Sequence, residues 1–252
     1  MPYQFATERP DYSDLASGRV FYSLPGHPAF PIRLADEILQ RCLAKRKADH
    51  LTGPCTLYDP CCGAAYQLGV LGYLHWQSFH EIIASDIEQD AVRVAQKNLG
   101  LLSIAGMDQR IGEINEMLRL YGKASHQDAL DSANRLRERI HSLAKEHSIE
   151  TRVFQASALN QQELHKNLKG ATIHIVFADV PYGQHSQWRS QDSSPELDNP
   201  IWRMLDALAG VLLPTSIVAV VSDKRQKASH EGYQRLEQFQ VGKRRVVILK
   251  PS

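Results

Sequence analysis

Short apolar runs alternate with amphipathic stretches along most of this chain. Five runs have the length and apolar content of buried strands, and a polar or acidic residue follows each of them within two positions: residues 55–58, 82–85, 151–155, 173–178 and 216–221. The intervening stretches place apolar residues three and four positions apart, as on one face of a helix. Residues 236–241 and 244–249 predict a closing hairpin. This alternation predicts a doubly wound α/β fold with a mainly parallel sheet covered on both faces.

Two segments depart from this alternation. Residues 1–30 are rich in Pro, Gly and aromatic residues without a period, which predicts an extended N-terminal arm before a helix that starts near Pro31. Residues 103–150 carry two consecutive helical patterns and predict a helical insertion. Ser125 and Asp128 resemble a capping box at the start of its second helix. We therefore expect a single domain over residues 1–252, with an arm and an insertion.

Composition and charge describe an ordinary globular protein. The chain has 252 residues, 43% of them hydrophobic, and a formal net charge of +1. The overall charge therefore does not indicate a polyanionic partner. Its four cysteines form no C-x-x-C pair, which favours neither a disulfide framework nor a metal site. The polar, acidic start and the lack of a long apolar run indicate neither a signal peptide nor a membrane span. These features favour a cytoplasmic protein whose cysteines are reduced.

Ligands of an open parallel sheet bind beyond the carboxyl ends of its strands. Four of the five residues at these predicted ends are carboxylates: Asp59, Asp86, Ser157, Asp179 and Asp223. An acidic crevice disfavours a pyrophosphate cofactor and suits one with a cationic sulfonium, an amino group and a ribose diol. Gly63 would allow close approach to the turn after the first strand, but the later glycines of a dinucleotide fingerprint are absent. A tight turn without a ligand is the alternative for Gly63 taken alone.

The sequence Asp179-Val180-Pro181-Tyr182 follows one of the most apolar strands. An amine on an aromatic base is a poor nucleophile, because its lone pair is delocalised into the ring. A carboxylate and a backbone carbonyl that accept its N–H bonds can aim that lone pair at a methyl group. Pro181 stiffens the turn, and the ring of Tyr182 can stack on a flat target. The alternative is a Pro-Tyr turn without chemistry.

These motifs are similar to class I methyltransferases that modify exocyclic amines, whose fourth motif reads [D/N]-P-P-[Y/F]. More narrowly, the chain resembles the AviRa-type 23S rRNA guanine methyltransferases, a family known for avilamycin resistance. The resemblance is carried by FPIRLADEILQR, DPCCGAAYQLGVLGYLH, ASDIEQDAVRVAQKNLGLLS, RLRERI, DVPYGQHSQW and GKRRVVILK. It implies a seven-stranded sheet with an antiparallel last strand, S-adenosyl-L-methionine as cofactor, and N-methylation of a guanine in 23S rRNA or the large ribosomal subunit.

The resemblance also implies roles for individual residues. The methionine part of the cofactor would contact Asp59, Cys61 and Gly63. Asp86 would hold the ribose, and Ile87 would flank the adenine. Residues 179–182 would hold the target base. The chain departs from the family pattern or the wider motif at three places: Ala65 replaces a glycine, Ser157 replaces an acid near the adenine amine, and Val180 replaces the first proline of the wider motif.

RNA binding would depend on local patches. Residues 119–147 carry six cations and four anions, and residues 222–245 carry seven cations and three anions. An ordinary solvated helix face explains the first cluster equally well, whereas the second cluster follows a strand end and could lie beside the crevice and bind phosphates. Trp188 could stack on an unpaired or flipped base, or pack against its own loop. The arm could cover the cofactor or grip RNA. The candidate RNA contacts are Trp188, Lys224, Arg225, Lys227, Arg135 and Arg139.

The resulting hypothesis is in-line methyl transfer to an exocyclic guanine nitrogen of 23S rRNA. Asp179 and the Val180 carbonyl orient the amine, Tyr182 stacks the base, and no strong general base is required. Resistance to a ribosome-targeting antibiotic such as avilamycin is a further expectation. The alternatives are methylation of adenine N6 or of a protein glutamine amide, and an inactive RNA-binding protein on the same fold. A nucleotide-dependent oxidoreductase is disfavoured by the missing glycines.

Overall fold

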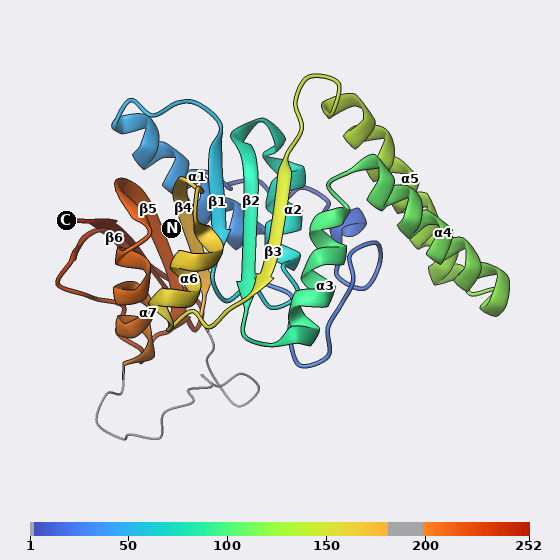
Figure 1. The fold of residues 1–252 in the computed structure, drawn as a ribbon. Coiled ribbons are helices and arrows are strands. Elements are labelled where there is room, and N and C mark those ends of the chain that lie inside the picture. Colours follow the sequence, from blue (N-terminus) through green and yellow to red (C-terminus); the bar gives the residue numbers. More distant parts are fainter. Residues whose placement is uncertain (1–2, 181–198) are drawn as a thin grey trace.

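A computed structural model of the chain describes residues 3–180 and 199–252. Seven strands form one sheet in the order β3-β2-β1-β4-β5-β7-β6 (Figure 1). Neighbouring strands pair in parallel, except that β7 runs antiparallel to both β5 and β6. The predicted doubly wound sheet with an antiparallel last strand is therefore confirmed. The strands are β1 (Cys55–Asp59), β2 (Phe79–Asp86), β3 (Glu150–Gln155), β4 (Ile173–Asp179), β5 (Leu212–Asp223), β6 (Tyr233–Val241) and β7 (Arg244–Pro251).

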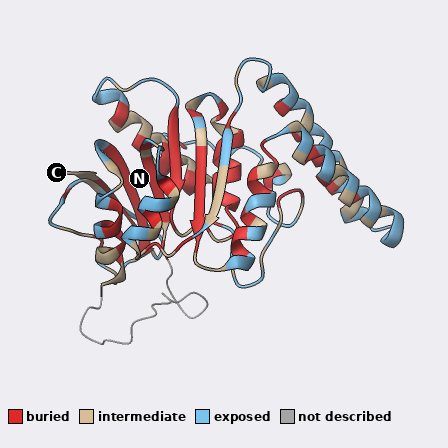
Figure 2. Cartoon of the chain, in the orientation of Figure 1, coloured by how far each residue is buried: buried red, intermediate tan, exposed pale blue. Residues whose placement is uncertain are grey.

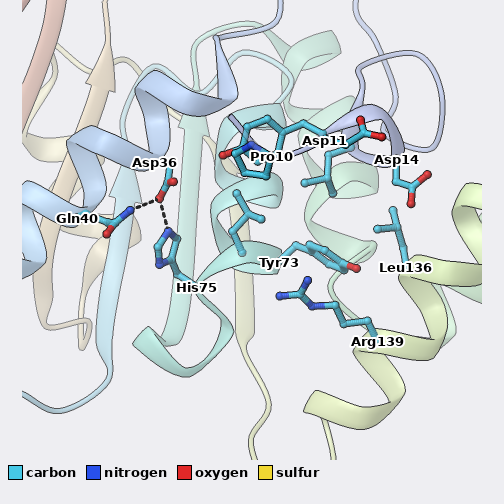
Figure 3. A pocket seen from close by; sticks show the side chains of 12 residues that line it. Pro10, Asp11, Asp14, Asp36, Gln40, Tyr73, His75, Leu136 and Arg139 are labelled. Carbon is cyan, nitrogen blue, oxygen red and sulfur yellow. Dashed lines mark hydrogen bonds and ion pairs between the residues drawn. The ribbon is translucent and has the colours of Figure 1, made fainter. Parts of the chain in front are cut away.

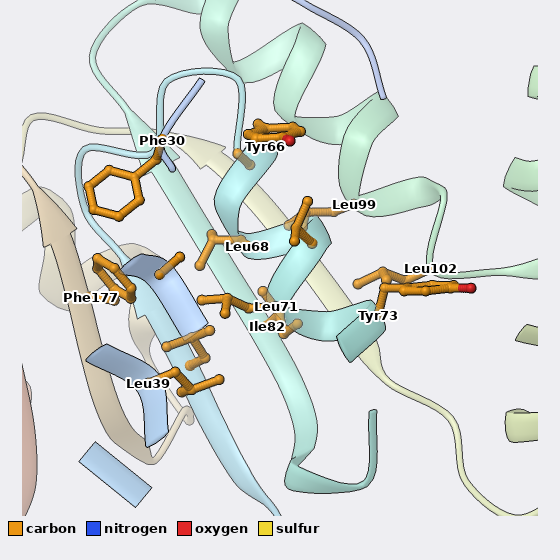
Figure 4. Close-up of a cluster of buried hydrophobic side chains, with 14 of the residues drawn as sticks. Phe30, Leu39, Tyr66, Leu68, Leu71, Tyr73, Ile82, Leu99, Leu102 and Phe177 are labelled. Carbon is orange, nitrogen blue, oxygen red and sulfur yellow. The ribbon is translucent and has the colours of Figure 1, made fainter. Parts of the chain in front are cut away.

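Helices cover both faces of this sheet and create two hydrophobic clusters. The first cluster, drawn in part in Figure 4, joins one sheet face to α1 (Ile32–Ala48), α2 (Tyr66–Leu74) and α3 (Gln89–Gly100). The second cluster joins the other face to α6 (Gln161–Leu168) and α7 (Pro200–Ala209). Because successive strand side chains point to opposite faces, each central strand contributes to both clusters. This alternation decides on which face the side chains at the strand ends lie.

The N-terminal arm packs along the body of the protein. It contains a short 3-10 helix, η1 (Ser13–Leu15), and its apolar side chains enter the first cluster. Phe21 lies edge-on to the ring of Tyr66, with 5.6 Å between the centroids. The fully buried carboxylate of Glu37 accepts N–H bonds from three successive arm residues, Gln4, Phe5 and Ala6. The arm is therefore part of the folded core.

Within the predicted insertion, residues 104–143 form a helical hairpin that projects from the body of the protein, and much of its surface is exposed (Figures 1 and 2). It consists of α4 (Ile104–Tyr121) and α5 (Ala124–Leu143). The predicted capping box is wrong: Lys123 is the N-cap of α5, and no side chain caps it. Gly122, with φ of +57°, ends α4, so α5 starts before Ser125 can act as its cap. None of the described helices is long and apolar enough to cross a membrane.

Candidate active site

Three carboxylates lie together at the carboxyl ends of adjacent strands. Asp86 ends β2, Asp59 ends β1 and Asp179 ends β4, and these strands are neighbours in the sheet. Each aspartate lies two residues after a strand residue that packs in the first cluster: Leu57, Ala84 and Phe177. Because side chains alternate between faces, all three carboxylates project to the face covered by α1, α2 and α3. The carboxylates predicted at these three strand ends therefore lie on one face of the sheet, where the charges of Asp179 and Asp86 act on Asp59.

Burial raises the pKa of all three carboxyl groups. The pKa of Asp59 lies well above its usual range, because the group is fully buried and the charges of Asp179 and Asp86 repel its own. Hydrogen bonds from the backbone of Cys61 (2.9 Å) and from Gln67 Nε2 (2.8 Å) oppose this shift. Negative charge is thus costly in this crevice. A positively charged ligand would remove part of that cost.

Asp86 connects the second strand to the turn after the first. One of its oxygens accepts an N–H bond from Gly63 (2.9 Å), and the other accepts one from Glu88 (3.0 Å). Both bonds oppose the rise in its pKa that burial causes. Each carboxylate oxygen can still accept a further hydrogen bond from a hydroxyl group, as a ribose-binding role requires.

The turn that follows β1 uses two residues in left-handed conformations. Gly63 has φ of +52°, and a Cβ placed there would lie 3.0 Å from Nδ1 of His27 in the arm. Ala65 has φ of +50° and is the N-cap of α2. This conformation costs a residue with a Cβ about 1 kcal/mol. The structure therefore explains why the resembled family tends to have glycine where this chain has Ala65.

The two residues assigned to the adenine side follow neighbouring strands: Ile87 comes directly after β2, and Ser157 lies two positions after β3. The carbonyl of Ile87 accepts a bond from Gln155 Nε2 (2.8 Å), and its side chain is half-buried. Ser157 Oγ accepts the N–H of Leu159 (3.3 Å), and its backbone N–H donates to Glu163 (2.8 Å). The serine hydroxyl retains a further acceptor position. An adenine contact by either residue stays a prediction.

Asp179 is the reactive candidate that the structure describes. Its Oδ1 is buried and has no hydrogen-bond partner among the described residues. Burial raises the pKa of Asp179 to about 7, and the positive charge of Arg244 opposes the shift. The backbone N–H of Val180 donates to the carbonyl of Val221 (3.0 Å), which holds the start of the turn against β5. Pro181, Tyr182 and Trp188 lie outside the described residues.

Sequence reasoning assigned no individual role to several residues that border this site. The ring of Phe30 lies edge-on to Phe177 (5.6 Å between centroids), and the guanidinium carbon of Arg244 lies 5.3 Å from the centroid of Phe30. The arm residue His27 approaches Gly63. The arm therefore borders the crevice, as one of its two predicted roles required. No sequence signal distinguished Arg244 from the other cations near the C-terminus.

Asn98, fully buried in α3, links the arm to the turn after β1. Its side chain bonds both the N–H and the carbonyl of Tyr22 (2.8 and 3.0 Å) and donates to the carbonyl of Ala64 (2.8 Å). The available signal was an asparagine on an otherwise apolar helical stripe. Among the residues described, no group of three His, Cys, Asp or Glu side chains could hold a metal ion.

The candidate RNA contacts divide between two regions. Lys224, Arg225 and Lys227 are exposed and follow β5, at the same sheet edge as the crevice. Arg135 and Arg139 lie on α5 instead. Arg135 is paired with Asp14 of the arm (2.6 Å). Arg139 lies over the ring of Tyr73 (4.9 Å) and lines a cavity of about 350 Å³ near the end of α2 opposite the turn after β1 (Figure 3).

A seven-stranded sheet of this order, with acidic residues where ligands bind, defines a class I methyltransferase fold. The family model described as rRNA methyltransferase AviRa matches residues 1–244, and the chain belongs to that family. It is 40% identical over 250 residues to the 23S rRNA (guanine(2535)-N(1))-methyltransferase of Streptomyces viridochromogenes, covering 99% of this chain and 96% of that protein.

Solved structures agree with this assignment. Two structures of the rRNA methyltransferase aviRa from Streptomyces viridochromogenes, at 2.4 and 1.5 Å, match with TM-scores of 0.85 and 0.86. Each is 38% identical in sequence, over 99% of this chain and 96% of the other. The protein is thus a methyltransferase of the AviRa family, and its fold is the one that its sequence predicted.

Proposed function

We propose that this protein transfers a methyl group from S-adenosyl-L-methionine to N1 of a guanine in 23S rRNA, in the cytoplasm. The observation that carries the proposal is the buried Asp179 carboxylate, with its unpaired oxygen at the end of β4. The relative's name specifies N1, a ring nitrogen. The acceptor is therefore changed from the exocyclic nitrogen of the sequence-based hypothesis.

A ring nitrogen alters what the site must do. Guanine N1 carries a proton, and its lone pair becomes available for attack only when that proton leaves. A general base works best when its pKa lies near the working pH. The pKa of Asp179, raised to about 7 by burial, meets this requirement better than that of an ordinary aspartate. We therefore assign Asp179 as the base, in place of the orienting role without strong base catalysis.

The residues of the crevice fit S-adenosyl-L-methionine. When bound, this cofactor supplies a methyl group on a positively charged sulfur. Asp59, Cys61 and Gly63 would border its methionine part, and Asp86 would accept its ribose hydroxyls. Asp59 and Asp179 can place negative charge beside a sulfonium, and the positive charge of the sulfonium would lower the cost of ionising these two buried carboxyl groups.

The RNA would lie along the edge where β5 ends. Lys224, Arg225 and Lys227 are exposed there and can take phosphates. Base stacking by Tyr182 and Trp188, orientation by the Val180 carbonyl and the turn set by Pro181 remain parts of the proposal, as does avilamycin resistance. The assignments of Arg135 and Arg139 to RNA remain predictions with less support, because both side chains contact groups of the protein itself.

Product mapping tests this function. Purified protein is incubated with unmethylated ribosomal RNA and cofactor labelled in the methyl group, and the RNA is then digested and analysed by mass spectrometry. We expect N1-methylguanine at one position of 23S rRNA and no label in 16S rRNA, which serves as the internal control. Label in adenine N6, in a protein glutamine or at an exocyclic guanine nitrogen would contradict the proposal.

Replacing Asp86 by alanine tests the cofactor site separately. Loss of hydrogen bonds to a charged acceptor is expected to weaken binding of S-adenosyl-L-methionine by about 10–100-fold. Isothermal titration calorimetry measures this change, and circular dichroism checks the fold. Asp90, exposed on α3, supplies the matched control, because its replacement by alanine leaves the crevice intact. Equal affinity of the Asp86 variant and the wild type would refute the ribose assignment.

A further inference from the structure

Arg244 is a cation at the crevice for which the proposed mechanism has no role so far. It is the first residue of β7 and pairs in register with Asp223, the last residue of β5. Because β7 is antiparallel, its first residue lies at the edge where the parallel strands end. Val246 and Ile248 pack in the first cluster, so Arg244 projects to the same sheet face. That face also carries the three carboxylates.

The guanidinium of Arg244 and the carboxylate of Asp179 belong to the same corner of this face. Asp179 pairs with Val221 of β5, and Val221 pairs with Val246 of β7, so one strand separates the two residues. The aromatic ring of Phe30 lies next to residues of both strands. The guanidinium carbon of Arg244 in β7 is 5.3 Å from its centroid, and the ring of Phe177 in β4 lies edge-on to it with 5.6 Å between centroids. The positive charge of Arg244 also lowers the pKa of Asp179, which opposes the larger rise caused by burial.

Chemistry at guanine N1 requires a second group besides a base. The N1–H bond breaks and its proton moves to the carboxylate, which leaves a negative charge shared between N1 and O6. N1 then forms the new bond to the methyl carbon, and the methyl–sulfur bond breaks with its electron pair remaining on sulfur. The charge on O6 disappears as this bond forms. A positive hydrogen-bond donor at O6 therefore stabilises the state that precedes and accompanies transfer.

We propose that Arg244 donates to O6 of the target guanine, while Asp179 takes the proton of the adjacent N1. This inference rests on the proposed function and identifies a catalytic residue for it. N1 and O6 are neighbours on one edge of guanine, and the two side chains offer one acceptor and one donor from one corner of the crevice. Adenine presents an amine in place of O6 and an unprotonated N1, so the same pair disfavours adenine.

Replacement of Arg244 by glutamine tests the proposal in single-turnover reactions with saturating cofactor and 23S rRNA. Loss of a charged donor at a developing oxyanion is expected to reduce the rate of transfer by about 10²–10³-fold. Arg244→Lys is expected to recover part of that loss, because it keeps the charge. Arg245→Gln is the matched control, because Arg245 faces the other side of the sheet and donates to the carbonyl of Gln226 (3.1 Å). The Arg245→Gln variant should transfer methyl at a rate within about twofold of wild type.

A second measurement, independent of turnover, follows ionisation of the N1–H group of the target guanine. The shortest methylated 23S rRNA fragment is labelled with ¹⁵N at N1 of the target guanine and bound to the protein with S-adenosylhomocysteine. We expect wild type to lower the pH at which the N1–H signal disappears, relative to free RNA. Arg244→Gln should shift that pH back upward by at least about one unit, with an RNA dissociation constant within about threefold of wild type.

The outcomes separate this inference from the proposed function. If wild type forms no N1-methylguanine, the proposed function itself fails. If wild type forms it, but Arg244→Gln keeps the wild-type rate and N1–H titration, the role of Arg244 is wrong. A variant that loses only RNA affinity, with an unchanged single-turnover rate at saturation, would make Arg244 a phosphate contact and also overturn the proposal. Melting curves of both Arg244 variants identify misfolding, and Arg244→Lys provides the test if the glutamine variant unfolds.

Discussion

Replacing Asp179 by asparagine is expected to lower the single-turnover rate of methyl transfer by about 10²–10⁴-fold, the usual contribution of a positioned general base. Asparagine keeps the size and the hydrogen-bonding oxygen of the side chain but cannot take the N1 proton. Quenched-flow measurement at pH 8 with saturating RNA and cofactor determines the change. Asp128→Asn, an exposed change on the helical hairpin, is the control and should react at the wild-type rate. Equal rates for Asp179→Asn and wild type would remove Asp179 from the mechanism.

The pH dependence of wild type tests the same assignment. Only the ionised carboxylate of Asp179 can accept a proton, and the pKa of this group in the free protein is raised to about 7. The value of kcat/KM should therefore rise about tenfold per pH unit below about 7 and level off above it. A flat profile between pH 5 and 8 would contradict this.

The same Asp179→Asn variant should be more stable than wild type at alkaline pH. Burial raises the pKa of Asp179 from 3.8 to about 7, so the folded state holds this proton more tightly than the unfolded state does. Stability is therefore lost as pH rises from about 4 to about 7, by up to roughly 4 kcal/mol. Urea unfolding should show the variant to be more stable at pH 8, with a much smaller difference near pH 4. A less stable variant at pH 8 would show that Asp179 supports the fold.

Asn98→Ala is expected to have the second large effect, on the attachment of the arm. It leaves the N–H and carbonyl of Tyr22 and the carbonyl of Ala64 without their partner inside the protein. The free energy of unfolding should fall by about 2–4 kcal/mol. Affinity for S-adenosyl-L-methionine should fall as well, because the arm residue His27 lies against Gly63.

Urea unfolding and calorimetry measure these two quantities. Asn115, exposed on α4, supplies the control, and its replacement by alanine should change the free energy of unfolding by less than about 0.5 kcal/mol. Loss of stability with unchanged cofactor affinity would show that the arm anchors the fold without shaping the site.

Much of the catalytic edge could be predicted from local sequence patterns. Each of the three aspartates follows an apolar run, and the parallel arrangement implied by the intervening helices brings such positions to one edge. The details of local geometry were less accessible. The capping box at Ser125 failed because the helix start is set by the left-handed Gly122, a backbone conformation that competes with side-chain capping. Ala65 was recognised as a departure, but its strained φ appeared only in the fold.

The sequence by itself determined the doubly wound sheet, the acidic strand ends and the family, because residue periodicity and short motifs are properties of contiguous chain. Only the tertiary structure placed all three carboxylates on one face, packed the arm against the crevice, and brought Arg244 to the corner that holds Asp179. These arrangements depend on the register of β5 with β7 and on packing between segments far apart in the chain. Distant contacts of this kind leave no periodic pattern along the sequence. Asp179 was visible in the sequence at a strand end, but its raised pKa follows from burial that only the fold creates.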